Sequence, residues 1–273
     1  MPTHSSQPLK HASPFSADAL AGRVVLVTGA AGTYGRAISY ALASAGARVV
    51  MTDVDGEALD AARLAVRDAG FGVASLVVAD MTRVEDVERL MRDIVTEHGR
   101  LDGLVHAAAY LGGVPFLEYE IDAMDRMIAL NLRATLVCAQ RSARVMAAHG
   151  GGSIVLLGSV GSLRAHASAV VYDACKGAVD AGARAMAVDL APYGIRVNVI
   201  APPRPVDRDA AVRDLWEGTL GLGADGILKR DLANAVVFLH SSASERMTGQ
   251  VLVVDNGLTA SLRWQAPHVV ADT

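Results

Sequence analysis

Tyr172 and Lys176 have the side-chain types and the spacing to move a proton together. They stand four residues apart in residues 171–191, whose apolar spacing predicts a helix, so both side chains leave the same helical face. A phenol with its ordinary pKa of about 10 is a poor base at neutral pH, and an adjacent ammonium group favours its ionised form. The pair therefore predicts an acid–base site centred on Tyr172. Such pairs are common on ordinary helices, so this prediction needs further residues.

Two other polar residues could complete such a site. Ser159 follows a predicted strand over residues 153–157, where its hydroxyl could hold a substrate oxygen. Asn131 is a polar residue inside a predicted apolar helix over residues 121–147. Each also has a structural explanation, because a serine before a glycine suits a loop and a core asparagine usually bonds to backbone.

A glycine-rich turn lies between a predicted strand over residues 24–28 and a predicted helix over residues 34–45. The backbone N–H groups of such a turn, with the helix N-terminus behind them, can face a pyrophosphate without side-chain obstruction. Glycines also serve plain tight turns, but the strand before and the helix after favour a dinucleotide site. The candidate binding residues here are Gly29, Gly32, Thr33, Tyr34 and Gly35.

Asp53 follows the second predicted strand, residues 48–52. A carboxylate there can accept hydrogen bonds from the ribose hydroxyls of an adenosine and would repel a 2′-phosphate, which favours NAD over NADP. The alternative is a helix N-cap, a role that Asp55 is expected to fill. No Lys or Arg stands within the glycine turn, although Arg36 lies just beyond it and could partner a 2′-phosphate.

Asp80 follows the third predicted strand, residues 74–78. Its carboxylate and the Met81 backbone would lie near an adenine ring. Helix capping by Asp80 or Thr82 explains the same residues equally well.

The elements that must position these side chains alternate along the chain from Arg23 onward. Short β-branched runs alternate with Ala-rich helical stretches, the pattern of repeated βαβ units. This predicts an α/β fold: a single-domain Rossmann-type doubly wound parallel sheet of about seven strands, with helices on both faces. Parallel strands end along one edge, where open α/β sheets bind ligands. Further strands are predicted over residues 103–106, 196–200 and 251–254, and further helices over 56–69 and 84–97.

Composition agrees with this fold and excludes other classes. Of 273 residues, 52% are hydrophobic and 4% aromatic, which suits parallel strands under Ala-rich helices. A net charge of −4 gives no basic footprint for nucleic-acid phosphates, so no nucleic-acid partner is expected. Cys138 and Cys175 have neither metal-ligand spacing nor a disulfide framework, which predicts no metal site and a reducing, cytoplasmic setting.

Residues 1–20 are polar and lack the continuous apolar stretch of a signal peptide or membrane span. They predict a flexible leader and no membrane partner. The folded domain is expected over residues 21–260, and residues 261–273 are expected to form a tail.

Together these motifs resemble the classical type of the short-chain dehydrogenase/reductase family, over about residues 21–258. The order of the motifs carries the resemblance: Thr28-Gly29…Gly35, Asp53, Asp80, Asn131, Ser159, Tyr172-x-x-x-Lys176, RVNVIAP ending at Pro202, and TGQVLVVDNG. The resemblance implies NAD as cofactor, with NADP less favoured, and a small-molecule secondary alcohol or ketone as substrate.

The resemblance also implies a role for each catalytic residue. Tyr172 would exchange a proton with the substrate as hydride moves to or from C4 of the nicotinamide. Lys176 would bond the nicotinamide ribose, and Ser159 would stabilise the substrate oxygen. Asn131 would hold a water that connects Lys176 to solvent.

A substrate lid over about residues 203–231 and a homo-oligomer, tetramer or dimer, follow from the same resemblance. Within the lid the Gly-rich residues 218–226 suggest mobility. An apolar substrate pocket could be lined by four side chains, which ordinary core packing explains equally well: Leu111, Trp216, Leu220 and Leu222.

Three positions depart from the family pattern. Thr33 replaces the middle glycine of the turn, where its Cβ could crowd a pyrophosphate or resist an unusual φ. The usual N-N-A-G is His106-Ala107-Ala108-Ala109, whose His106 and Ala108 we keep as cofactor-binding candidates and whose imidazole we interpret as a structural substitute. The usual P-G is Pro202-Pro203, which removes an N–H near the nicotinamide.

Three functions remain open at this point. An NAD-dependent alcohol dehydrogenase or ketoreductase is favoured by the four catalytic candidates with Asp53. A cofactor-binding but catalytically weak regulatory or scaffold protein is suggested by Thr33, His106 and Pro203. An NADP-dependent biosynthetic ketoreductase would require that NADPH outcompete NADH, which Asp53 opposes.

Overall fold

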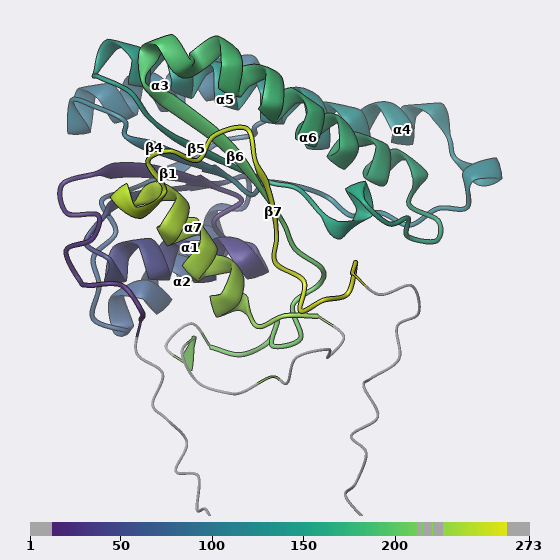
Figure 1. Ribbon diagram of the computed structural model, residues 1–273, viewed down its shortest axis with the longest axis horizontal. Helices are drawn as coiled ribbons and strands as arrows, with labels where there is room; N and C mark the ends of the chain where they lie inside the picture. Colours follow the sequence, from purple (N-terminus) through teal and green to yellow (C-terminus); the bar gives the residue numbers. More distant parts are fainter. Residues whose placement is uncertain (1–12, 212–213, 216–219, 221–225, 261–273) are drawn as a thin grey trace, which may run out of the picture.

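The computed structural model describes residues 13–211, 214–215, 220 and 226–260. Within these residues, seven strands form one parallel sheet in the order β3-β2-β1-β4-β5-β6-β7 (Figure 1). The strands are β1 (Val24–Thr28), β2 (Arg48–Asp53), β3 (Ser75–Val78), β4 (Gly103–His106), β5 (Gly152–Leu157), β6 (Ile195–Ala201) and β7 (Val251–Val253). The predicted doubly wound, Rossmann-type sheet is confirmed.

Helices cover both faces of the sheet (Figure 1). On one face lie α1 (Thr33–Ser44), α2 (Gly56–Asp68) and α7 (Lys229–His240). On the other lie α3 (Val84–His98), α4 (Ile121–Ile128), α5 (Ala134–Ala148) and α6 (Val170–Leu190). Short 3₁₀ turns occur at Phe116–Glu118, Val160–Ser162, Ala191–Tyr193 and Ser242–Ser244. The sequence analysis did not predict α7.

The helix expected over residues 121–147 is interrupted. A π turn, Ala129–Arg133, joins α4 to α5 and contains Asn131. Single π turns insert one extra residue per turn and often occur at functional sites. The interruption therefore coincides with a residue that sequence analysis had selected for chemistry.

Strand β1 lies inside the sheet, between β2 and β4, and its five residues are all buried and mostly β-branched, as is typical of interior parallel strands. Alternate side chains enter opposite cores, with Val25 and Val27 on the α1 side and Val24 and Leu26 on the α6 side. The strand order reverses between β1 and β4, which makes the crevice beyond their carboxyl ends the expected ligand site.

The folded chain begins before residue 21. Leu20 is 1% exposed, its N–H donates to Ala45 O at 2.8 Å, and Phe15 packs against the same core. The leader predicted over residues 1–20 therefore includes packed residues at its end, and its first twelve residues lie outside the described part. No helix within the described residues is both long and apolar enough to cross a membrane.

The turn from β1 to α1 depends on two glycines. Gly29 has φ +64°, and a Cβ there would lie 2.7 Å from Ala108 N. A Cβ on Gly35 would lie 2.0 Å from Gly29 O, whereas one on Gly32 would lie 3.2 Å from the same oxygen. Thr33 begins α1 in an ordinary helical conformation, so the strained φ expected of it is absent.

We predict that Gly35→Ala destabilises the protein by at least about 2 kcal/mol, because its methyl group would meet backbone that cannot move aside. Gly32→Ala is the matched control and should cost less than about 1 kcal/mol, since its neighbour is farther and its φ is ordinary. Urea unfolding of both variants measures the difference. Equal losses of stability would contradict the assignment of Gly35 as the close-approach position.

Candidate active site

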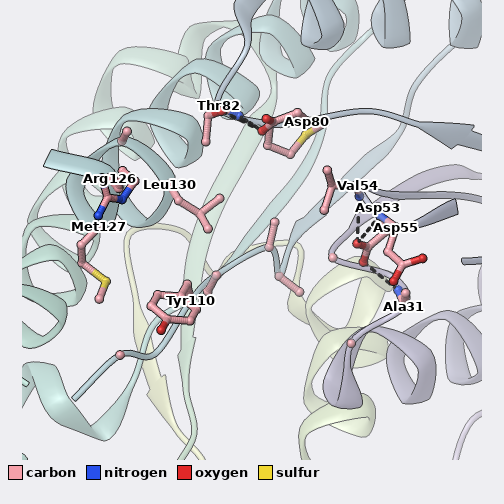
Figure 2. A pocket seen from close by; sticks show the side chains of 18 of the residues that line it. Ala31, Asp53, Val54, Asp55, Asp80, Thr82, Tyr110, Arg126, Met127 and Leu130 are labelled. Atoms are coloured by element: carbon pink, nitrogen blue, oxygen red, sulfur yellow. Dashed lines mark hydrogen bonds between the residues drawn. The ribbon is translucent and has the colours of Figure 1, made fainter. Parts of the chain in front are cut away.

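A cavity of about 970 Å³ opens at the carboxyl edge of the sheet (Figure 2). Asp53 and Asp55 line one end, and Tyr110, Met127 and Leu130 line the other. Six of the residues predicted to bind a cofactor line it: Gly29, Gly32, Asp53, Asp80, Met81 and Ala108. The other predicted site residues lie outside its lining: Thr33, Tyr34, Gly35, His106, Asn131, Ser159, Tyr172, Lys176 and Pro202.

Sequence analysis missed the half of the cavity formed by the loop after β4 and by α4 with the π turn. Tyr110, Val114, Met127 and Leu130 belong to this half. Their types carry no chemical signal. They could have been found only from the strand order, which directs the end of β4 toward the same edge as β1.

Asp53 is held against the glycine turn by backbone N–H groups (Figure 2). Its Oδ2 accepts from Ala31 N at 3.0 Å, and its Oδ1 accepts from Val54 N at 2.8 Å and Asp55 N at 3.3 Å. Asp55 caps α2 by accepting from Ala58 N, as expected. Asp53 is thereby free of the capping role and stays at the cavity wall.

Asp80 is engaged in a turn. Its Oδ1 accepts from Thr82 N at 2.8 Å and from Thr82 Oγ1 at 2.7 Å (Figure 2). Its own N–H donates to Asp86 Oδ2. These contacts form a turn before α3, whose N-cap is Arg83 without a side-chain cap bond, so the expected helix capping by Asp80 or Thr82 is not found. Asp80 and Met81 also line the cavity, so the adenine role stays a prediction.

Lys176 is buried on α6, one helical turn after Tyr172. Its Nζ donates to Leu157 O at 2.7 Å and lies 5.6 Å from the centre of the Tyr172 ring. Burial lowers the pKa of Lys176 to about 8, because the charged form loses water. The lysine is thus fixed at the end of β5, beside the phenol.

Ser159 follows β5 and lies near the phenol of Tyr172. Its Oγ accepts from Gly161 N at 3.0 Å. The pKa of Tyr172 is raised, because burial of the phenol outweighs the opposing effect of Ser159. The lowering expected from Lys176 alone is therefore not found, and the phenol keeps its proton at neutral pH.

Asn131 joins the π turn to the loop after β4. Its Nδ2 donates to Tyr110 O at 3.0 Å and Met127 O at 3.2 Å, and its Oδ1 accepts from Tyr110 N at 3.2 Å. These are the bonds of a satisfied core amide. They also position Tyr110 and Met127 at the cavity wall, while the water-holding role of Asn131 stays a prediction.

His106 ends β4 and lies beside Thr28, the last residue of the neighbouring strand β1. Thr28 Oγ1 accepts from Ala107 N and Ala108 N at 3.2 and 3.3 Å, so its proton is available for His106 Nδ1 at 3.0 Å. The proton of the imidazole then lies on Nε2, which is buried without a partner among the described residues. Burial, with the nearby Lys176, lowers the pKa of His106 to about 3, so the ring is neutral.

Tyr34 links the glycine turn to the segment after β6. Its hydroxyl donates to Pro203 O at 2.8 Å, and Val160 N donates to Pro202 O at 3.1 Å. Burial, the largest cause, raises the pKa of Tyr34 above its ordinary range. No local pattern indicated this bridge, because Tyr34 and Pro203 are far apart in the chain.

The two ends of the predicted lid are anchored to each other. Pro205 forms a β-bridge with Ile227, and Val206 N donates to Ile227 O at 2.9 Å. Lys229 is buried, and its Nζ donates to Ala210 O at 2.6 Å. Of the apolar pocket candidates, Leu111 is 63% exposed and outside the cavity lining, and Leu220 is half-buried; Trp216 and Leu222 lie outside the described residues.

Known proteins are similar to this chain in sequence and in fold. The model of a family described as enoyl-(acyl carrier protein) reductase matches residues 29–259. The chain is 37% identical over 251 residues to cis-4-hydroxycyclohexanecarboxylate dehydrogenase of Sinomonas cyclohexanicum, covering 89% of this chain and 99% of that protein.

Two solved structures superpose closely. A short-chain dehydrogenase from Mycobacterium smegmatis gives a TM-score of 0.78 at 30% identity, covering 92% of this chain and 97% of that chain. An NAD⁺-bound xylitol dehydrogenase gives a TM-score of 0.78 at 28% identity, covering 87% and 99%.

We predict that the free energy of unfolding falls as pH falls from about 6.5 toward 4. The pKa of a histidine is about 6.5 when unfolded, but burial lowers it to about 3 for His106 and about 4 for His240. The unfolded chain therefore binds more protons in this window, and each histidine costs about 1.4 kcal/mol at pH 5.5.

Urea unfolding at pH 7.5 and 5.5 checks this expectation. His106→Asn should lose less stability than the parent between the two pH values, by about 1.4 kcal/mol, because one of the two buried histidines is gone. Carboxylates that titrate in the same range are common to both proteins. An identical loss in both would show that His106 is not held neutral by the fold.

Proposed function

This chain belongs to the classical type of the short-chain dehydrogenase/reductase family and is an enzyme of that family, and from this premise we propose that it interconverts a secondary alcohol and a ketone with NAD as cofactor. Tyr172 is the general acid and base. The observation that carries the proposal is the position of Tyr172, with the ammonium group of Lys176 fixed 5.6 Å from its ring by Leu157 O and with Ser159 near its phenol. The relatives named above as alcohol-oxidising dehydrogenases support this reaction class.

The residues present fit a dinucleotide. Gly29 and Gly35 hold a turn that a Cβ would block, and the first N–H groups of α1 lack intrahelical partners. No acidic side chain stands in the first turn of α1, so nothing there competes with a pyrophosphate. A bound nicotinamide would supply the hydride acceptor or donor, and Lys176 is the residue expected to hold its ribose.

Asp53 supports NAD over NADP. Its carboxylate lies at the cavity wall, where it can accept from ribose hydroxyls and repel a 2′-phosphate. Arg36, the cation that could have served NADP, is exposed and outside the cavity lining, and its charge acts on Lys229. The xylitol dehydrogenase that resembles this chain was solved with NAD⁺.

The protonation state of Tyr172 determines what the enzyme needs in each direction. Because burial raises the pKa of Tyr172, the phenol can donate a proton directly to a ketone oxygen at neutral pH. Alcohol oxidation requires the phenol to lose that proton first, so the neighbouring Lys176 ammonium matters most in this direction. Ser159, which lies near the Tyr172 phenol, would hold the substrate oxygen beside it.

The departures from the family pattern do not favour a catalytically silent protein. Thr33 enters α1 without backbone strain, and the imidazole of His106 is accommodated by Thr28. Pro203 uses its carbonyl to accept from Tyr34, so the segment stays joined to the glycine turn. We therefore propose an active enzyme over a regulatory or scaffold protein.

A homo-oligomer, tetramer or dimer, is proposed as the working form. Apolar side chains of α5, α6 and the turn after it are exposed, among them Leu136, Val188 and Tyr193. Light scattering measures the mass in solution.

A reducing, cytoplasmic setting is proposed as well. Cys138 and Cys175 are both free and buried, which supports it.

We predict that Tyr172→Phe lowers turnover by at least ~10²-fold, because it deletes the proton donor while keeping the ring. NADH binding, measured by calorimetry, should persist, because the glycine turn and Asp53 are untouched. Hydride transfer is followed at the nicotinamide absorbance with a panel of secondary alcohols and ketones. Near-normal turnover in the variant would rule out this role, and cofactor binding by the parent without any turnover would favour a regulatory protein.

We predict that Asp53→Ser raises kcat/KM with NADPH relative to NADH by at least roughly tenfold, since a repulsion worth about 1.4 kcal/mol at the 2′-phosphate is removed. The parent should prefer NADH. Asp55→Ser is a suitable control, because that residue also lines the cavity but serves as a helix cap. A parent that prefers NADPH would support the biosynthetic ketoreductase instead.

A further inference from the structure

His166 and Asp173 form a pair beside Tyr172 that the proposed mechanism leaves unused. The carboxylate of Asp173 accepts from His166 N at 2.8 Å and bonds His166 Nδ1 at 2.9 Å. The His166 and Tyr172 rings lie with their centres 6.5 Å apart in an edge-on arrangement. A histidine fixed by two bonds thus stands next to the proton-transfer residue.

The surrounding chain is shaped to keep this pair. A Cβ on Gly161 would lie 2.0 Å from Asp173 Oδ1 and 2.8 Å from the His166 ring, so a side chain at this position would displace the pair from its present arrangement. The side chain of Asp173 is 13% exposed, whereas that of His166 is 40% exposed. The buried carboxylate therefore orients a ring that still reaches solvent.

The loop that carries His166 is bonded to the wall of the cavity. Ser168, two residues beyond His166, accepts from Val114 N at 2.8 Å through its carbonyl, and Val114 lines the cavity. This bond joins the loop between Ser159 and Tyr172 to the loop after β4. His166 thus lies in a loop that is connected to both the catalytic residues and the cavity wall.

The hydrogen bonds of the His166 ring determine whether its free nitrogen can donate or accept. A carboxylate can only accept, so His166 Nδ1 carries a proton, and in the neutral form of the ring Nε2 keeps its lone pair. Among the described residues, no side chain or backbone group bonds this Nε2. A neutral His166 therefore presents an acceptor, which suits a hydroxyl group that donates and does not suit a carboxylate.

We propose that His166 is a specificity-determining residue whose Nε2 accepts a hydrogen bond from a second hydroxyl of the substrate, so that the enzyme acts on diols and polyols. Asp173 is the positioning residue of this contact. The proposal rests on the proposed function, because it concerns the substrate whose hydroxyl exchanges its proton with Tyr172. Both oxygens would belong to one molecule, one at Tyr172 and one at His166.

The test compares substrates that differ by one hydroxyl. Cyclohexanol is paired with its 1,2-, 1,3- and 1,4-diols, and kcat/KM is measured for each with NAD⁺. The parent should prefer at least one diol over cyclohexanol by roughly tenfold, as expected for one well-placed hydrogen bond. A parent without such a preference overturns the proposal.

Two substitutions at one position separate the contact from the fold. His166→Asn keeps a donor at the place of Nδ1 for Asp173 but ends short of Nε2, so the diol preference should fall toward unity. His166→Gln reaches the place of Nε2 and should retain part of the preference. His149→Phe, at an exposed histidine after α5, is the control and should leave the preference unchanged. An unchanged preference in His166→Asn overturns the proposal.

A binding measurement keeps the two proposals distinguishable. If the parent transfers no hydride with any alcohol or ketone, the proposed function fails. Ligand-observed NMR with the NAD⁺-loaded protein then still tests His166 through the binding of the diols against cyclohexanol. Selective diol binding that His166→Asn abolishes supports the contact, and equal binding of both ligands overturns it.

Discussion

The parallel register of the sheet is the constraint on which the rest of the structure depends. Because all its strands run in one direction, Thr28, Asp53, His106 and Leu157 come to the same edge although they are far apart in the chain. Beyond the last paired residues of each strand, backbone N–H and C=O groups at this edge have no partner in the sheet and can bind side chains instead. Asp53 and Lys176 are each fixed by such groups, so the geometry of the site follows from the geometry of the sheet.

The carboxyl ends of the adjacent strands β1 and β4 show how this edge accommodates His106, which stands where the family pattern has an asparagine. Thr28 receives two backbone N–H groups and supplies its own proton to the imidazole of His106. Nδ1 of His106 thus accepts a hydrogen bond at the position where the family pattern has the amide of an asparagine. The same turn leaves Gly29 in close approach to Ala108, which sets the wall of the cavity.

Burial determines the charges in the site more strongly than the neighbours do. It lowers the pKa of Lys176 to about 8 and of His106 to about 3, and it raises the pKa of Tyr172. The spacing of Tyr172 and Lys176 in the sequence had instead predicted a lowered pKa for the phenol. The proton that Tyr172 keeps is the one that ketone reduction uses, so the environment favours the acid role at neutral pH.

The sequence by itself determined the fold class, the strand positions to within a residue or two, and the spacing of Tyr172 and Lys176, because these depend on local periodicity. Tertiary structure alone decided the strand order, the π turn at Asn131 and the Tyr34–Pro203 bridge. It also decided that His166 meets Asp173 in the space that the absence of a side chain at Gly161 leaves. Such contacts depend on long-range packing and burial, for which residue types and spacing carry no signal.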